Sequence, residues 1–301
     1  MKKRCSELEM QRGSDFKTAN VRANGLSFSC IESGEGPLVL ALHGFPDLPR
    51  TFRHQMRYLA AAGYRVVAPY MRGYFPTDAP EGPYETAALV QDALALMDAL
   101  SAEPAILIGH DWGAAAVYGA AILAPHKVSK LITIAVPPSA VFVTSLITNP
   151  EQQRRSWYMY FFQLPVAEMA VAHNDYAFLE RLWLDWSPGW HYPPEEMAAL
   201  KDTFRQPGVL KAALSYYRHT LNPVNHSSGL APVRERLRDP IGVPTLYIHG
   251  KDDGCIGLET TEGLGKAFSA EVQRKVLDGG HFIHRERPDE VNRLIGEFLQ
   301  E

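Results

Sequence analysis

The chain has 301 residues, of which 46% are hydrophobic and 21% charged, a composition typical of folded globular proteins and not of disordered or fibrous ones. Its formal net charge of -4 gives no basic surface for nucleic acid, so we expect a neutral small molecule as the ligand. The cysteines, Cys5, Cys30 and Cys255, are odd in number and form no CxxC pair, which argues against a disulfide framework or a zinc site and favours a reducing, cytoplasmic setting.

The N-terminal 20 residues begin with basic side chains and then become polar. They lack the apolar segment of a signal peptide, so we expect a loosely ordered extension. No apolar run approaches the ~20 residues that span a bilayer, so no membrane insertion is expected. The sequence leaves open whether the protein is a monomer or a homodimer.

Strands and helices alternate along the chain, and several strands are short apolar runs typical of burial on both faces. The first predicted elements are an edge strand at 26–32, a strand at 37–42, a helix at 51–62, a strand at 64–68, a helix at 85–100, a strand at 105–109, a helix at 112–123 and a strand at 130–136. The last are a strand at 244–249, a helix near 258–268, a strand at 272–277 and a helix from 288 onward. This order predicts an α/β fold with a mostly parallel central sheet flanked by helices.

The alternation stops at Pro137 and Pro138, and from about 139 to 222 aromatic and helix-compatible stretches replace the β-branched runs. This change predicts an inserted helical cap. We therefore expect an α/β core formed by residues 1–137 and 223–301, with the cap at 138–222. Large aromatic residues give the cap apolar surface to pack on the core, namely Trp157, Phe161, Phe162, Phe178, Trp183, Trp186 and Trp190.

A G-x-D-x-G element at residues 109–113 joins the strand at 105–109 to the helix that follows it. In this strand-to-helix turn the central residue is usually a serine nucleophile, and here it is Asp111. A carboxylate is a poor catalyst of acyl transfer but a good nucleophile toward a saturated carbon with a strained or departing group. Asp111 therefore indicates epoxides or alkyl halides as substrates and excludes esters and peptides.

Such a nucleophile needs an acid and a histidine, which follow it in that order along the chain. His281, in the GGHF segment after the last predicted strand, is the predicted general base, whereas His284 is predicted to be structural. The acid follows the strand at 244–249 in the segment GKDD. The G-x-x-D spacing selects Asp253, with Asp252 as the alternative.

An oxyanion hole needs two backbone donors. The N–H of Trp112, directly after the nucleophile, is the first. The second is the N–H of Phe45 in the HGFP segment, where Pro46 fixes the loop through its rigid ring or a cis bond. The alternative for HGFP alone is an ordinary tight turn.

With HGFP, GHDWG, MRGY at 71–74, GKDDG and GGHF in this order, the chain resembles the soluble and bacterial epoxide hydrolases of the α/β-hydrolase superfamily. The similarity spans residues 28–299. It implies an α/β-hydrolase fold with an inserted helical cap, and a reaction that needs no metal and no organic cofactor. The core motifs are shared with haloalkane dehalogenases, so the cap must distinguish the two families.

The resemblance also implies two cap tyrosines that donate hydrogen bonds to the epoxide oxygen. The segment SWYMYFFQ at 156–163 points to Tyr158, with Tyr160 as the alternative. The segment SYYR at 215–218 points to Tyr217, with Tyr216 as the alternative. A phenol with an ordinary pKa of ~10 stays protonated at neutral pH and can donate to an oxygen that gains charge.

The expected activity is hydrolysis of a small hydrophobic epoxide by water to a vicinal diol, through a covalent ester on Asp111. The residues expected to bind substrate are Phe45, Trp112, Phe162 and Trp183. A haloalkane dehalogenase is the alternative; because Phe45 has no side-chain donor, its halide ligands would be the Trp112 N–H and a cap tryptophan such as Trp183. A further alternative is a ligand-binding protein that has kept the fold without turnover.

Overall fold

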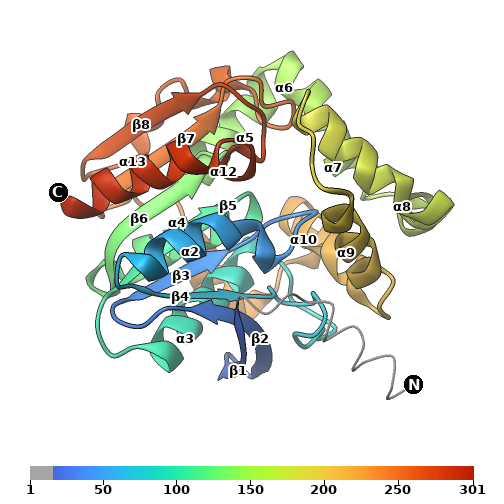
Figure 1. Cartoon of the computed structure of the whole chain (residues 1–301). Helices are drawn as coiled ribbons and strands as arrows, with labels where there is room; N and C mark the ends of the chain where they lie inside the picture. Colours follow the sequence, from blue (N-terminus) through green and yellow to red (C-terminus); the bar gives the residue numbers. More distant parts are fainter. Residues whose placement is uncertain (1–15) are drawn as a thin grey trace.

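An eight-stranded sheet runs through the computed structural model, which describes residues 16–301 (Figure 1). The strand order is β1-β2-β4-β3-β5-β6-β7-β8. The strands are β1 (Lys17–Ala23), β2 (Leu26–Ser33), β3 (Leu38–Leu42), β4 (Arg65–Pro69), β5 (Ala105–His110), β6 (Val128–Ile134), β7 (Thr245–Gly250) and β8 (Val272–Leu277). Strands β3 to β8 pair in parallel, whereas β2 is antiparallel to both of its neighbours. The predicted α/β class with a mostly parallel sheet is confirmed.

The helices form two groups (Figure 1). Those of the core are α2 (Arg53–Ala61), α3 (Thr86–Leu100), α4 (Trp112–Leu123), α11 (Ala231–Arg236), α12 (Ile283–Glu286) and α13 (Pro288–Gln300). Those of the segment 139–221, which follows β6, are α5 (Ser139–Thr148), α6 (Pro150–Arg155), α7 (Trp157–Phe161), α8 (Ala167–Trp186), α9 (Pro194–Phe204) and α10 (Val209–Leu221). None of the helices in the described part of the chain is long and apolar enough to cross a membrane.

Two local predictions are wrong. The strand predicted at 26–32 is not at the edge, because β1 pairs with it through a hairpin turn at Asn24 and Gly25, both with positive φ. The predicted extension therefore ends earlier than expected; its first 15 residues lie outside the described part of the chain. The helix predicted near 258–268 is instead two short 3-10 turns, η5 (Leu258–Thr261) and η6 (Leu264–Ala267), separated by Gly263 with a φ of 77° that an α-helix does not allow.

Apolar side chains form a core on each face of the sheet. On one face, Met56 of α2 and Ile295 of α13 belong to a buried cluster with alternate residues of the central strands. On the other, Leu96 of α3 and Val117 of α4 belong to a larger cluster that continues into the helices between β6 and β7. All five residues of β3 are buried, as expected for a strand covered on both faces. The sheet is thus a rigid support for residues at its strand ends.

Close packing of α4 against the sheet depends on glycine. A Cβ atom at Gly113 would lie 1.9 Å from the carbonyl oxygen of Leu42 at the end of β3. The start of α4 therefore lies directly above the carboxyl ends of the central strands, where ligands of open α/β sheets bind.

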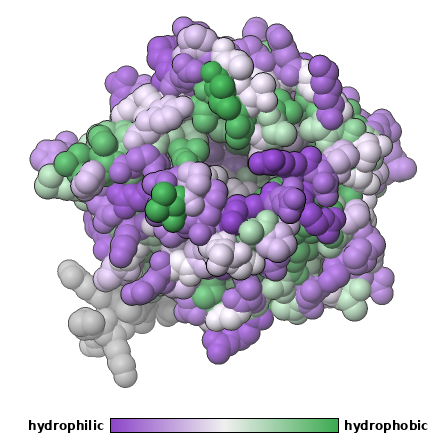
Figure 2. All heavy atoms as spheres, turned by 180° about the vertical axis from the view of Figure 1, so that it is seen from behind, coloured by the Kyte–Doolittle hydropathy of each residue, from purple (hydrophilic) through white to green (hydrophobic). Residues whose placement is uncertain are grey.

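The opposite view of the molecule shows hydrophobic residues in separate groups among hydrophilic ones, around a hollow near the middle of that face (Figure 2).

Candidate active site

Asp111 sits at the sharp turn between β5 and α4. Its φ of 53° and ψ of -120° are unfavourable for a residue with a side chain, so the surrounding structure must hold the turn in place. Two glycines make the turn possible, since a Cβ at Gly109 would lie 2.5 Å from the carbonyl oxygen of Gly113. The carboxylate is 7% exposed and faces the groups described below.

The loop after β3 supplies a backbone donor to this carboxylate. The N–H of Phe45 donates a hydrogen bond of 2.7 Å to Oδ1 of Asp111. The approach requires glycine before it, because a Cβ at Gly44 would lie 2.3 Å from the same oxygen. The Phe45-Pro46 peptide bond is cis. Trp112 is the first residue of α4, at the helix end whose N–H groups have no partner within the helix.

Asp253 and His281 come from the loops after β7 and β8. Oδ2 of Asp253 accepts a hydrogen bond of 2.9 Å from Nδ1 of His281, and its Oδ1 accepts the N–H groups of the next loop residues. The other imidazole nitrogen, Nε2, lies 3.7 Å from Oδ2 of Asp111. Asp252, the alternative acid, is exposed and contributes its N–H to Gly279. The structure thus brings Asp111, His281 and Asp253 together and leaves Asp252 outside.

Two carboxylates control the protonation of His281. Burial by itself would lower the pKa of His281, but the charge of Asp253 and contact with Asp111 outweigh it and raise the pKa to about 10. Burial would conversely raise the pKa of Asp111, but the close contact with His281 and its charge outweigh burial and hold the pKa below its ordinary value. The free protein therefore contains an ionised Asp111 carboxylate beside an imidazolium.

Tyr158 of α7 and Tyr217 of α10 approach each other, with 5.6 Å between ring centroids. The hydroxyl of Tyr217 is buried and has no hydrogen-bond partner among the described residues. Burial raises the pKa of both phenols well above the ordinary value, and the nearby Asp111 carboxylate raises it further. Both phenols therefore stay protonated and can donate hydrogen bonds.

The two alternative tyrosines lie elsewhere. Tyr160 is 50% exposed, and the Tyr216 hydroxyl donates to the carbonyl oxygen of Arg72 at 2.7 Å.

Comparison with known proteins shows the family of this chain. The sequence model of the family described as alpha/beta hydrolase fold matches residues 37–288. Epoxide hydrolase 4 of Homo sapiens is 33% identical over 293 residues, which cover 93% of this chain and 78% of that protein. The chain belongs to the epoxide hydrolases of the α/β-hydrolase family.

Other members of the family are similar over nearly the whole chain. Epoxide hydrolase A of Mycobacterium tuberculosis is 30% identical over 311 residues, covering 93% of this chain and 96% of that protein. The crystal structure of the Bacillus megaterium epoxide hydrolase with an inhibitor superposes with a TM-score of 0.80 at 28% identity, covering 94% of this chain and 100% of that one.

Three of the expected substrate-binding residues surround Tyr217. The ring centroids of Phe45, Trp112 and Phe162 lie 5.3, 5.0 and 5.1 Å from that of Tyr217. Trp183 is placed differently: its indole N–H donates to the carbonyl oxygen of Pro46 at 2.8 Å, and its ring packs on other residues of the cap and on Phe282. We assign Trp183 to the packing between cap and core rather than to the substrate site.

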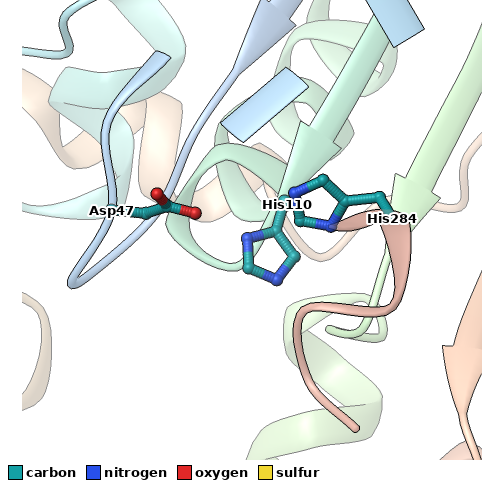
Figure 3. Close-up of side chains that lie close together, drawn as sticks. All are labelled: Asp47, His110 and His284. Atoms are coloured by element: carbon teal, nitrogen blue, oxygen red, sulfur yellow. The ribbon is translucent and has the colours of Figure 1, made fainter. Parts of the chain in front are cut away.

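A second group of buried polar residues consists of Asp47, His110 and His284 (Figure 3). His110 directly precedes Asp111 in the sequence. Each has a buried atom without a hydrogen-bond partner in the described chain. One possible ligand atom from each residue lies within 4.8 Å of those of the other two. Two imidazoles and a carboxylate are a donor set that transition metals accept. However, Nη1 of Arg285 lies 3.5 Å from Asp47 and already faces this carboxylate with a positive charge, which disfavours a cation.

The same group connects the turn between β5 and α4 to the loop after β8, which carries His281. Nε2 of His110 lies 3.0 Å from the carbonyl oxygen of His281, to which it donates a hydrogen bond. Nε2 of His284 lies 2.6 Å from the hydroxyl of Thr51. Burial lowers the pKa of His110 to about 3 and that of His284 well below the ordinary value, so both rings are neutral. His284 therefore has a structural contact with Thr51 and is not part of the group formed by Asp111, His281 and Asp253.

Three residues of the site have no signal in the sequence motifs. His110 holds the catalytic loop, as described above. The carbonyl oxygen of Trp186, at the end of α8, accepts the N–H groups of both Gly254 and His281 at 3.0 Å, so the cap is fixed to the acid and histidine loops. Cys255 places its thiol 3.3 Å from the Tyr158 hydroxyl. Nothing in the spacing of the motifs identifies these contacts, because they join segments distant in the sequence.

Proposed function

We propose that this chain hydrolyses epoxides to vicinal diols through a covalent ester on Asp111. The observation that carries the proposal is the pair of buried phenols whose pKa values the Asp111 carboxylate raises, together with His281, whose Nε2 lies 3.7 Å from the same carboxylate. Relatives named epoxide hydrolases support the same reaction, and a variant of the Bacillus megaterium enzyme has been crystallised with a naphthyloxy-propanediol product.

The two oxygens of Asp111 have different roles. Oδ1 is occupied by the Phe45 N–H, so Oδ2 is the atom that attacks an epoxide carbon. Opening of the ring leaves charge on the epoxide oxygen, and the hydroxyls of Tyr158 and Tyr217 donate to it. Because these phenols are buried, their hydrogen bonds to a developing charge are stronger than the same bonds in water. The product of this step is a hydroxyalkyl ester whose carbonyl oxygen is Oδ1.

Ester formation prepares the second step. The charge of Asp111, which helps to raise the pKa of His281, disappears when the ester forms. The pKa of His281 therefore falls, and the opened oxygen takes up one proton as the imidazole becomes neutral. Neutral His281, held by Asp253, then removes a proton from water, which attacks Cγ of Asp111. The Phe45 and Trp112 N–H groups stabilise the oxyanion. When the tetrahedral intermediate collapses, the diol oxygen leaves with the proton of the hydroxyl that was added to Cγ, so Asp111 is again a carboxylate and His281 again an imidazolium.

The substrate class follows from the walls of the site. Phe45, Trp112 and Phe162 are buried aromatic residues around the phenols, and we propose that they bind the apolar part of a small hydrophobic epoxide. Residues 138–222 act as the cap that carries both tyrosines. Trp183, the side chain expected to supply the second halide donor of a dehalogenase, donates its N–H to the carbonyl oxygen of Pro46 instead.

Product analysis tests the proposal. The purified chain is incubated with a panel of epoxides and a panel of haloalkanes, and diol and halide are measured. We expect diol from epoxides without halide from haloalkanes. Halide release without diol would show that the protein is a dehalogenase. If neither product forms, the protein is a ligand-binding member of the fold without turnover.

A matched pair of variants tests the acid. Asp253→Asn removes the charge that orients His281 and should slow turnover by ~10⁴-fold, the loss seen for the acid of a serine triad, with the ester accumulating. Asp252→Asn changes the exposed neighbour and should leave turnover unchanged. Equal losses in the two variants would contradict the assignment.

A further inference from the structure

A buried thiol lies beside the tyrosine that is proposed to open the epoxide. Cys255 follows Asp253 by two residues and is fully buried. Its Sγ is 3.3 Å from the hydroxyl oxygen of Tyr158. It also lies within 4.8 Å of a carboxylate oxygen of Asp253 and a nitrogen of His281. No step of the mechanism above uses this thiol.

The backbone of Cys255 is fixed from both the core and the cap. Its N–H donates to Oδ1 of Asp253 at 2.7 Å. Its carbonyl oxygen accepts a hydrogen bond of 2.9 Å from Nε2 of Gln152, a fully buried residue of α6. These two hydrogen bonds fix the backbone from which the Cys255 side chain extends.

The two phenols differ in their surroundings. Tyr217 has a hydroxyl without a partner among the described residues, and its ring is enclosed by aromatic neighbours. Tyr158 has a hydroxyl partner, and that partner is a thiol, which is only a weak donor and acceptor. An epoxide oxygen is a better hydrogen-bond acceptor than sulfur, so a bound substrate can accept the Tyr158 O–H hydrogen bond in place of Cys255 at a small cost in free energy. The S–H of Cys255 can then rotate and donate a hydrogen bond to the phenol oxygen.

The thiol is suited to this part and not to nucleophilic attack. Burial raises the pKa of Cys255 well above its ordinary value, and the charges of Asp253 and Asp111 raise it further. The group remains S–H, and the thiolate that would compete with Asp111 for the epoxide does not form.

We propose that Cys255 is a positioning residue for epoxide opening, whose thiol holds the Tyr158 hydroxyl where it can donate to the ring oxygen. The inference rests on the proposed function. It predicts an effect on ester formation alone, because Tyr158 acts in that step and not in ester hydrolysis.

Single-turnover kinetics of Cys255→Ala test the inference. Loss of one neutral hydrogen bond should slow ester formation by about threefold to tenfold, with the rate of ester hydrolysis unchanged. Cys255→Ser, which keeps a donor and an acceptor, should recover part of the loss. Cys30→Ala removes the second buried thiol of residues 16–301, which lies in β2, and serves as the matched control with wild-type rates.

Coupling between residues separates positioning from a general packing effect. In a Tyr158→Phe background the effect of Cys255→Ala should vanish, whereas in a Tyr217→Phe background it should persist. The same slowing in both backgrounds, or a slower ester hydrolysis, would overturn the inference. If Cys255→Ala does not fold, Cys255→Val fills the space without a polar atom and carries the same cycle.

The two proposals can fail separately. A wild-type protein that forms no diol from any epoxide overturns the proposed function and this inference with it. A wild-type protein that forms diol, combined with a Cys255→Ala variant that forms the ester at the wild-type rate, overturns only the role of Cys255.

Discussion

Tyr217→Phe should remove activity without a cost in stability. The hydroxyl of Tyr217 is buried and has no partner in the described chain, and a buried polar group without a partner costs ~1–3 kcal/mol. Phenylalanine keeps the ring and its contacts with Phe45, Trp112 and Phe162. We therefore expect the free energy of unfolding to stay equal or to rise by up to ~1–3 kcal/mol.

The effect on the reaction should be large. Removal of one donor to a developing oxyanion typically lowers the rate by about 100-fold to 1000-fold, and that loss should appear in ester formation. Tyr216→Phe is the matched control, because the neighbouring hydroxyl donates to the Arg72 carbonyl and not to the site. This variant should lose about 1 kcal/mol of stability and keep its rate of ester formation.

Denaturant unfolding and rapid-quench measurement of the ester give both quantities. The reasoning is refuted if Tyr217→Phe forms ester at the wild-type rate. It is equally refuted if Tyr217→Phe is less stable than Tyr216→Phe, since that would mean that the Tyr217 hydroxyl has a stabilising partner.

Three further predictions concern the charges and the turn at the site. Asp111→Asn removes one of the carboxylates that raise the pKa of His281, so this pKa should fall from about 10, as an NMR titration can measure; an unchanged value would contradict the coupling. Because the folded pKa lies above the ordinary 6.5, His281 stabilises the wild-type fold below that pH, and this contribution should be lost as the pH rises through about 10. Gly113→Ala places a Cβ 1.9 Å from the backbone of β3 and should destabilise or unfold the chain in thermal melts, whereas Gly265→Ala points into open space and should not; equal melting temperatures would contradict the account of the turn.

The parts of the fold and of the candidate site that the sequence predicts are those with a local motif. The turn at Asp111 is specified within five residues by its glycines. The loop of Asp253 directly follows the buried strand β7, and the loop of His281 follows the more polar strand β8. Chain order and parallel topology then suffice to bring these segments to one edge of the sheet. The structure places these three side chains together, while their roles remain predictions that the experiments above test.

The remaining features depend on long-range packing or on weak local signals. The polar strand β1 has no apolar run, and its hairpin with β2 is marked only by the Asn24-Gly25 pair, which favours such turns. Which aromatic rings line the site depends on how the cap docks, so Trp183 could not be distinguished from Phe162. The contact of Cys255 with Tyr158 joins residues 97 positions apart, beyond the reach of any local pattern.

The covalent ester on Asp111 is the central claim, and its most direct test is a single turnover in isotopically labelled water with enzyme in excess over epoxide. Attack of water on Cγ of Asp111 predicts that the label enters the Asp111 carboxylate, as mass spectrometry of the peptide reports, and that the first diol is unlabelled. Label in the first diol with none in Asp111 would contradict the account, because water would then have attacked the epoxide directly.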